Sequence, residues 1–497
     1  MRYYSTRGLS EFTTAAEAIK QGLAPDGGLF VPADRPAPFK TDRLPAGSYG
    51  EIAAKIFKLY LSGFEESILG KAVDSAYSET SFGHPVVTPL RRLAGNLHVL
   101  ELWHGPTSAF KDIALQILPH FMRAAIRITG ENKDIVILTA TSGDTGKSAL
   151  EGFRDVPGTR IIVYYPRDGV SEVQQLQMTT QEGNNVAVAA VKGNFDDTQK
   201  GVKEIFSSRD LAARLADAGY RLSSANSINW GRLVPQIVYY FAAYRDLVGR
   251  GEVRQGDKVN FVVPTGNFGN ILAGYYAREL GLPVNRLICA ANRNNVLTDF
   301  INTGRYQSRR PLHRTFSPSM DILVSSNLER LLFELSDHEA GRVAAWMEQL
   351  RETGEYILDP EILRRLQDLF WSDFADDRET LQAIGATYRE HNYLIDTHTA
   401  VGRAVLDKYT EREKDDTVSV ILSTASPYKF TGSVTRALFG DKRFEGVTEL
   451  ELLKILSRET GTAIPPDLAK LEQKPIRHRR EIDREEMAGH LLEILKL

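Results

Sequence analysis

Short apolar segments of strand length alternate with helical segments along most of the chain, and this alternation limits its possible folds more than any other feature. Three such segments lie at 134–140, 160–166 and 186–191, and two more at 258–264 and 286–291. Runs that are apolar at nearly every position are typical of strands buried on both faces of a parallel sheet. The pattern therefore predicts a doubly wound α/β protein, in which ligands bind at the carboxyl ends of the strands.

The composition is that of an ordinary globular protein and argues against several other classes. Of the residues, 25% are charged and 42% are hydrophobic. A chain of 497 residues is too long for one compact core. A net charge of -3 predicts no nucleic-acid surface. No run of about 18 apolar residues predicts a membrane span, and the amino end shows no apolar signal core. Cys289 is the only cysteine and no Cys/His spacing predicts a metal site, so we expect a cytoplasmic protein.

Lys111 is the first candidate for chemistry. It follows a predicted strand at 97–103 and a Gly-Pro break, and it lies in the first turn of a predicted helix with Thr107 or Ser108 as N-cap. The positive end of that helix and the apolar neighbours both disfavour an ammonium ion, so we expect the pKa of Lys111 to be lowered. A neutral amine can form an imine with a carbonyl compound. The alternative interpretation is a surface lysine.

Three polar turns follow predicted strands or open predicted helices. Ser142–Gly146 comes directly after the strand at 134–140. Asn226–Arg232 opens a long helix, where it either holds a phosphate or carboxylate or forms a simple capping turn. The glycine-rich turn at 265–270 joins a strand to a helix and can hold a phosphate, although glycine at such a bend also has a purely geometric use.

Five blocks of the sequence, in order, resemble the signature blocks of the threonine synthase family in its longer bacterial and fungal form. They are the Lys111 segment, Ser142–Gly146, Asn226–Trp230, Gly266–Asn270 and Ser423–Phe430. The resemblance covers essentially the whole chain. It implies the tryptophan synthase β fold, with two doubly wound parallel-sheet lobes and pyridoxal 5'-phosphate (PLP) in the cleft. It also implies the last step of threonine biosynthesis, in which O-phosphohomoserine and water give L-threonine and phosphate.

The resemblance implies roles for individual residues. Lys111 resembles the Schiff-base lysine, and Thr424 resembles the hydroxyl that meets the pyridine nitrogen. The expected loop for the cofactor phosphate consists of Gly266, Asn267, Phe268, Gly269 and Asn270. The expected loop for the substrate carboxylate consists of Ser142, Gly143, Asp144 and Thr145. Our candidates for the substrate phosphate are Ser227, Asn229 and Arg232. The chain departs from the family pattern at Ser426, where many relatives have histidine, and at Tyr428, where they have alanine.

The predicted organisation has three parts. They are an N-terminal segment over 1–90, a catalytic region over 91–440 and a C-terminal helical extension over 441–497. Within the catalytic region the smaller lobe covers about 130–225, and the larger lobe covers 91–129 and 226–440. We also expect a peripheral helical insertion over 328–391 and a further strand at 393–396. The expected assembly is a monomer or a homodimer.

Other functions stay open at this point. A threonine-synthase-like phospholyase uses the same substrate but gives 2-oxobutanoate, ammonia and phosphate. A P-loop nucleotide-binding protein is suggested by Gly146-Lys147-Ser148, although the glycine that this motif needs five places earlier is Thr141. A homologue that only binds ligands is disfavoured by the presence of Lys111.

Overall fold

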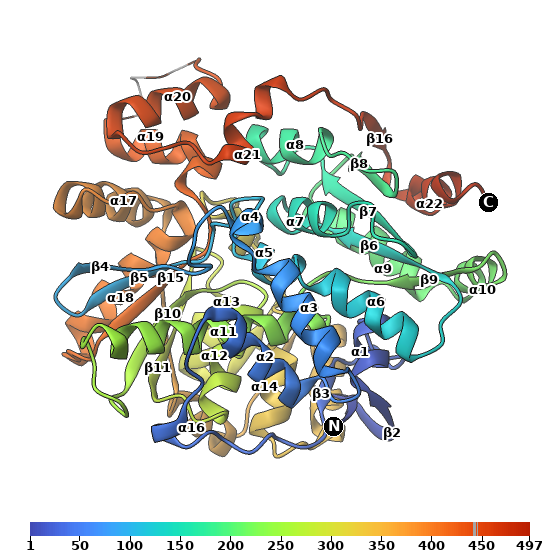
Figure 1. The fold of residues 1–497 in the computed structure, drawn as a ribbon, viewed down its shortest axis with the longest axis horizontal. Helices are drawn as coiled ribbons and strands as arrows, with labels where there is room; N and C mark the ends of the chain where they lie inside the picture. The colour runs from blue at the N-terminus through green and yellow to red at the C-terminus, as the bar shows by residue number, and fades with distance from the viewer. Residues whose placement is uncertain (441–443, 445) are drawn as a thin grey trace.

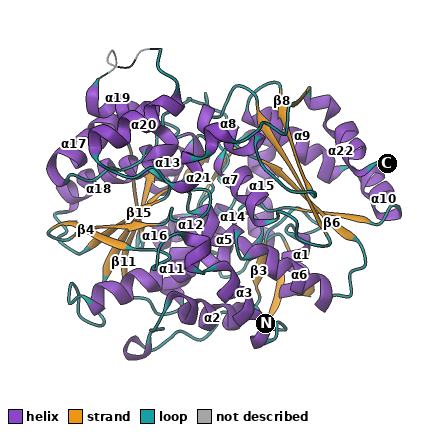
Figure 2. Ribbon diagram, turned by 45° about the horizontal axis from the view of Figure 1, so that its top comes forward, coloured by secondary structure: helices purple, strands orange, loops and turns teal. Residues whose placement is uncertain are grey.

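Two largely parallel β-sheets with helices packed around them form the framework of the chain (Figures 1 and 2). The computed structural model describes residues 1–440, 444 and 446–497. In spatial order the larger sheet contains β14 (Phe370–Phe374), β11 (Val284–Ala291), β10 (Val259–Pro264), β15 (Ser419–Ser423), β5 (Leu97–Glu101) and β4 (Leu90–Ala94). Only the pair β4 and β5 is antiparallel. The smaller sheet, parallel throughout, contains β16 (Arg480–Ile482), β8 (Val186–Val191), β7 (Thr159–Pro166), β6 (Asp134–Ala140) and β9 (Tyr220–Ser223). The predicted doubly wound α/β fold is confirmed.

Two small antiparallel sheets and the helices complete the fold. The small sheets are β2 (Gly8–Thr14), β1 (Arg2–Ser5) and β3 (Phe30–Pro32), and β12 (Arg305–Gln307) with β13 (Glu355–Ile357). The helices up to the glycine-rich turn are α1 (Ala15–Gln21), α2 (Tyr49–Tyr60), α3 (Glu66–Ala76), α4 (Glu79–Phe82), α5 (Lys111–Leu115), α6 (Leu118–Ile128), α7 (Asp144–Gly152), α8 (Glu172–Thr179), α9 (Phe195–Ser207), α10 (Arg209–Asp217) and α11 (Trp230–Gly249). The later helices are α12 (Gly269–Glu279), α13 (Val296–Thr303), α14 (Leu328–Leu335), α15 (Ala340–Thr353), α16 (Pro360–Gln367), α17 (Asp377–His391), α18 (Thr397–Glu413), α19 (Thr431–Phe439), α20 (Glu449–Thr460), α21 (Pro466–Ala469) and α22 (Met487–Leu495). None of the described helices is long and apolar enough to cross a membrane.

Helix α11 is the centre of the main hydrophobic core. Its apolar side is buried, as Ile237, Val238 and Phe241 show, and so are Tyr239 and Tyr240 on its other faces. A helix that is apolar nearly all round is stable only when other elements surround it. Contacts with α2, α5 and α12 provide this cover, so the N-terminal segment and the Lys111 helix share one core.

The region 328–391 is less peripheral than the predicted helical insertion. It contains β14, which pairs in parallel with β11 and forms the edge of the larger sheet. The predicted strand at 393–396 is wrong, because these residues have no strand pairing and Asp396 is the N-cap of α18. Their apolar side chains, Leu394 and Ile395, are buried against helices instead, in the cluster that includes Ala383 and Val434.

The C-terminal segment, predicted as a helical extension, also contributes a strand. Its β16 extends the smaller sheet beside β8, and Figure 1 shows the segment (red) passing α8 on its way to α22. Asp467 of α21 accepts hydrogen bonds from Ser108 Oγ at 2.8 Å and from Gln177 Nε2 at 3.0 Å. Ser108 precedes α5, beside the larger sheet, and Gln177 lies in α8, beside the smaller sheet. The Asp467 carboxylate therefore connects segments that pack beside the two sheets.

Gly152 lies where α7 meets the backbone of α5. A Cβ atom at this position would overlap the carbonyl oxygen of Leu115, so one of the two helices must shift if Gly152 is replaced by a residue with a side chain. We expect Gly152→Ala to lower the free energy of unfolding by about 1–3 kcal/mol in urea denaturation. The matched control is Gly70→Ala in α3, where an added Cβ meets nothing within 4 Å. This control is expected to be neutral or to stabilise the protein by up to about 1 kcal/mol. Equal effects of the two substitutions would contradict the close approach of α5 and α7.

Candidate active site

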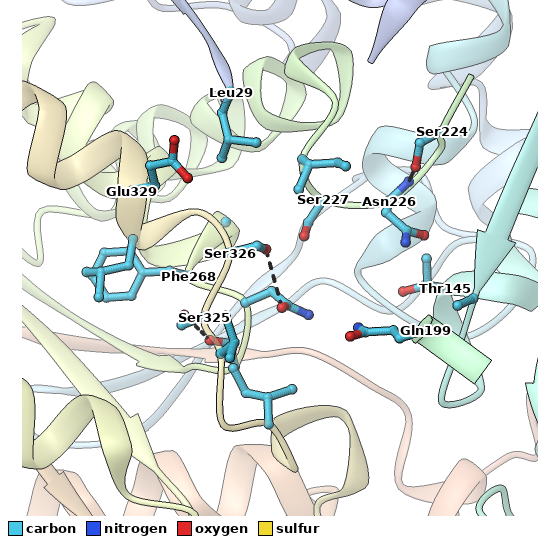
Figure 3. A pocket seen from close by; sticks show the side chains of 18 of the residues that line it. Leu29, Thr145, Gln199, Ser224, Asn226, Ser227, Phe268, Ser325, Ser326 and Glu329 are labelled. Atoms are coloured by element: carbon cyan, nitrogen blue, oxygen red, sulfur yellow. Dashed lines mark hydrogen bonds between the residues drawn. The ribbon is translucent and has the colours of Figure 1, made fainter. Parts of the chain in front are cut away.

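A cavity of about 820 Å³ lies where strands of both sheets end. Thr141 follows β6 of the smaller sheet, while Thr265 and Thr424 follow β10 and β15 of the larger sheet, and all three line the cavity. The carboxyl ends of parallel strands are where doubly wound proteins bind ligands. Figure 3 shows how polar side chains from several elements, among them Thr145 and Ser227, surround this space.

Most residues predicted for the site line this cavity. They are Lys111, Ser142, Asp144, Thr145, Ser227, Arg232, Gly266, Asn267, Phe268, Gly269, Asn270 and Thr424. The structure does not place Asn229 there: it is the buried N-cap of α11, accepting from Gly231 N and donating to Ile19 O and Ser224 O. The capping interpretation therefore holds for Asn229. Gly143 is also outside the lining, and its φ of 132° gives it a backbone role, because a side chain there would collide with Gln174.

Lys111 is the first residue of α5 and is buried, but the predicted cap is wrong. Phe110 occupies the N-cap position without a side-chain cap bond. Thr107 instead donates to the Asp112 carboxylate, through its backbone N–H at 2.8 Å and its hydroxyl at 2.6 Å. The acceptor is thus the side chain of Asp112, inside the helix, and the donor is Thr107, ahead of the helix. These two hydrogen bonds fix the turn that precedes Lys111.

The amine of Lys111 belongs to a buried group of three charges. Its Nζ lies 3.4 Å from Asp144 Oδ2, while Lys429 Nζ lies 2.8 Å from Asp144 Oδ1. Burial lowers the pKa of Lys111, the Asp144 carboxylate opposes this, and the positive charges of Lys429 and Arg232 add to the lowering. Burial would raise the pKa of Asp144, but the two lysines outweigh it and hold that pKa well below its usual range. The pKa of Lys111 is thus lowered, as expected, mainly through lost hydration.

Sequence reasoning gave Lys429 no role, although it orders the site. It is fully buried and also donates to the carbonyl oxygen of Thr107 at 2.9 Å, close to the start of α5. Gln174 Nε2 donates to Asp144 Oδ1 at 2.9 Å and supports the same carboxylate from α8. The sequence offers one signal for Lys429. Its neighbours are the aromatic residues Tyr428 and Phe430, which favours burial of the lysine but does not identify its partner.

The glycine-rich turn connects β10 to α12 at the wall of the cavity. Phe268 adopts a left-handed conformation with φ of 62° and is buried, a strained geometry that is common at ligand sites. Asn270 Oδ1 accepts from the Tyr239 hydroxyl at 2.5 Å, whereas its buried Nδ2 has no partner. The first N–H groups of a helix such as α12 also lack acceptors within the helix. This end of the cavity therefore presents donors suited to an anion.

A segment to which the sequence analysis gave no role lies against this turn and lines the cavity with it. Ser325 Oγ donates to the carbonyl oxygen of Gly266 at 2.6 Å, and Ser326 Oγ donates to Asn267 Oδ1 at 3.4 Å (Figure 3). The backbone N–H of Asn327 donates to Asn267 O at 3.1 Å. We call residues 317–327 the loop wall, because they hold the glycine-rich turn in place.

The cavity carries an excess of positive charge. Its cationic side chains are Arg7, Lys111, Lys203, Arg232 and Arg351, and its carboxylates are Asp144 and Glu329. Both carboxylates are already paired, Asp144 with two lysines and Glu329 with Arg7 at 2.7 Å. Arg232 is buried, which lowers its pKa to about 10, and its Nε has no acceptor. A buried guanidinium with an unused donor favours an anionic ligand such as a phosphate.

Comparison with known families agrees with this geometry. A family model described as pyridoxal-phosphate dependent enzyme matches residues 82–424, more than half of the chain. The chain therefore belongs to the family of pyridoxal-phosphate dependent enzymes. Models for the threonine synthase N terminus and the threonine synthase C-terminal region match residues 2–77 and 399–488. The chain belongs to the threonine synthase family.

Individual relatives extend over most of the chain. A threonine synthase of Pseudomonas aeruginosa is 40% identical over 95% of this chain and 97% of its own length. Human threonine synthase-like 1 is 38% identical over 91% of this chain, and the match spans only 61% of that relative's length. A crystal structure of PLP-bound threonine synthase from Brucella melitensis superposes with a TM-score of 0.86, at 35% identity, over 100% of both chains.

The residues present fit the cofactor that the family implies. PLP needs an amine that can be neutral, and burial lowers the pKa of Lys111. Its phosphate needs donors that no protein group already uses, and Asn270 Nδ2, beside the glycine-rich turn, is such a donor. The structure and the family therefore agree on PLP.

Removal of the Lys429 charge tests the group of three charges. Lys429 lowers the pKa of Lys111, so Lys429→Met is expected to raise that pKa and to move the pH at which the amine captures PLP to higher values. The rate of appearance of the visible imine band, measured against pH, checks this. Lys454→Met, at an exposed lysine paired with Glu472, is the control and should leave the profile unchanged. A shift to lower pH would contradict the assigned electrostatics.

Proposed function

We propose that this chain is a threonine synthase, which converts O-phosphohomoserine and water to L-threonine and phosphate. The observation that carries the proposal is a single cavity with a buried amine of lowered pKa, Lys111, and the unpartnered donors of Arg232 and Asn270. The amine suits PLP chemistry, and the donors suit a site that holds two phosphates, one on the cofactor and one on the substrate. The threonine synthase models at both ends of the chain support this particular substrate.

We assign the cofactor to three parts of the cavity. Lys111 would carry the Schiff-base link, Gly266–Asn270 and the start of α12 would hold the phosphate, and Thr424 would meet the ring nitrogen. A neutral hydroxyl at that nitrogen does not force it to stay protonated, as a carboxylate would. When bound, PLP supplies an electron sink that makes the α-proton of the substrate removable. The amine of Lys111 is then the group that takes up and returns protons.

We assign the substrate to the remaining polar groups. Ser142 and Thr145, at the start of α7, would bind its α-carboxylate, and Ser227 with Arg232 would bind its phosphate. In the overall reaction the bond from Cγ to the phosphate oxygen breaks, Cβ loses a proton and takes up a hydroxyl group from water, and Cγ gains a proton. The departing phosphate carries two negative charges, which the buried guanidinium of Arg232 would offset.

The structure gives no support to nucleotide binding at Gly146-Lys147-Ser148. Lys147 Nζ donates to Glu151 Oε2 at 3.0 Å, and Ser148 Oγ donates to Asp112 Oδ1 at 2.7 Å. Both side chains are buried within the fold and neither lines the cavity. A phospholyase, in contrast, would use the same residues as the synthase, so the product distinguishes these two activities.

Absorbance and product analysis test the proposal directly. The purified protein supplied with PLP should show a visible imine band that borohydride removes, and Lys111→Ala should lack this band. With O-phosphohomoserine the wild type should release threonine and phosphate in equal amounts. A 2-oxo acid in place of threonine would identify a phospholyase, and the absence of any imine band would refute the whole assignment.

Arg232 is expected to separate substrate binding from cofactor binding. Because a hydrogen bond to a charged group contributes about 1.5–3 kcal/mol, Arg232→Ala should raise the KM for O-phosphohomoserine by roughly 10- to 100-fold. The affinity for PLP, measured by absorbance titration, should change little. Arg232→Met, which keeps the side-chain volume, controls for the cavity that alanine leaves. Equal losses of substrate and cofactor affinity would remove Arg232 from the substrate phosphate.

A further inference from the structure

Two side chains at the start of α18, one of which lines the cavity, have no role in the proposed reaction. Asp396 is fully buried and accepts from His398 Nδ1 at 2.8 Å, from His398 N at 2.9 Å and from Thr399 N at 3.1 Å. His398 is also buried, yet it lines the cavity. A buried carboxylate bound so completely fixes the orientation of the groups that donate to it.

The hydrogen bonds of His398 define which ring nitrogen carries the proton. The carboxylate of Asp396 can only accept, so Nδ1 carries the proton. Nε2 then has a free lone pair, and it accepts from the backbone N–H of Ser319 at 3.2 Å. Phe430 packs edge-on against the imidazole, with ring centroids 4.8 Å apart. The ring is thus held from three sides and connects Asp396 to the loop wall.

Ser319 is a residue through which the loop wall contacts the glycine-rich turn. A Cβ atom at Gly266 would lie 2.8 Å from the carbonyl oxygen of Ser319, so the two backbones touch with no room for a side chain. Ser319 Oγ also lies 3.5 Å from Asp144 Oδ2. Without an acceptor at His398 Nε2, the N–H of Ser319 would lose its partner and this contact would loosen.

The same carboxylate reaches a second part of the site. Thr399 Oγ1 donates to Asp396 and lies 3.0 Å from Ser423 Oγ, which also accepts from Trp103 Nε1 at 3.0 Å. Ser423 precedes Thr424, the residue assigned to the ring nitrogen. Asp396 therefore orders both the loop wall and the strand end that bears Thr424.

We propose that His398, oriented by Asp396, is a positioning residue that holds the loop wall against Gly266–Asn270 and so sets the affinity for the phosphate group of PLP. The inference rests on the proposed role of this glycine-rich turn. It predicts an effect on the phosphate and not on the rest of the cofactor, because Ser319 touches the turn at Gly266.

The experiment compares PLP with pyridoxal, which has the same ring and aldehyde but no phosphate. The full chain, freed of cofactor, is titrated with each compound, and the imine band gives the two dissociation constants. In His398→Asn the amide is too short to reach Ser319, whereas in His398→Gln the Oε1 atom can replace Nε2 as the acceptor. We expect His398→Asn to weaken PLP binding by about tenfold, the loss expected for one buried hydrogen bond. Pyridoxal binding should change by less than about twofold, and His398→Gln should restore most of the PLP affinity.

Asp396→Asn is a second test with almost no change of shape. An asparagine amide can donate to Nδ1, which moves the ring proton to Nε2, where it faces the N–H of Ser319. This variant should therefore also lose affinity for PLP more than for pyridoxal. Thermal unfolding of the variants shows whether they fold.

The outcomes separate the inference from the proposed function. Equal weakening of PLP and pyridoxal binding, or an unchanged ratio in both His398→Asn and Asp396→Asn, would overturn the inference while leaving the proposed function in place. If the wild type formed an imine with neither compound, the proposed function would fail and the inference with it. If His398→Asn does not fold, the ratio measured with Asp396→Asn decides.

Discussion

The buried contact of Asp144 with Lys111 and Lys429 is the interaction on which the rest of the structure depends. Asp144 begins α7 beside the smaller sheet, whereas both lysines come from segments beside the larger sheet. A carboxylate between two ammonium groups gains strong attraction only where water is excluded and the geometry is held closely. The surrounding hydrogen bonds hold that geometry. Burial, together with the charges of Lys429 and Arg232, outweighs the effect of Asp144 and lowers the pKa of Lys111, as its chemistry needs.

The segments that come last in the chain complete this centre. Asp467 joins Ser108 to Gln177, and Tyr428 donates its hydroxyl to the carbonyl oxygen of Thr462 at 2.9 Å. Tyr428 and Ser426 are the two positions at which the sequence departs from the expected family pattern, and Ser426 donates its backbone N–H to Ser108 O at 3.0 Å. The departure from the family pattern thus coincides with contacts to the C-terminal segment and to the turn before Lys111.

The strands predicted from apolar runs are present because such runs are stable only when both faces are covered. The errors arise where packing decides between alternatives of equal local preference. Leu394 and Ile395 are as apolar as a strand, yet no neighbouring strand is available and helices bury them. Phe370–Phe374 lies among helical patterns, yet it pairs with β11, and Arg480–Ile482 is a strand only because β8 offers a free edge. Local patterns do not reveal pairing partners that lie far away in the sequence.

By itself the sequence determined the parallel α/β class, the place of Lys111 at a helix start, and the polar turns at strand ends. These follow from periodicity and turn chemistry, which act over a few residues. Only the tertiary structure decided that Asn229 caps α11 away from the cavity, that Lys429 pairs with Asp144, and that His398 supports the turn at Gly266. The physical reason is that burial and charge pairing depend on which distant segments meet, and no short stretch of sequence records that meeting.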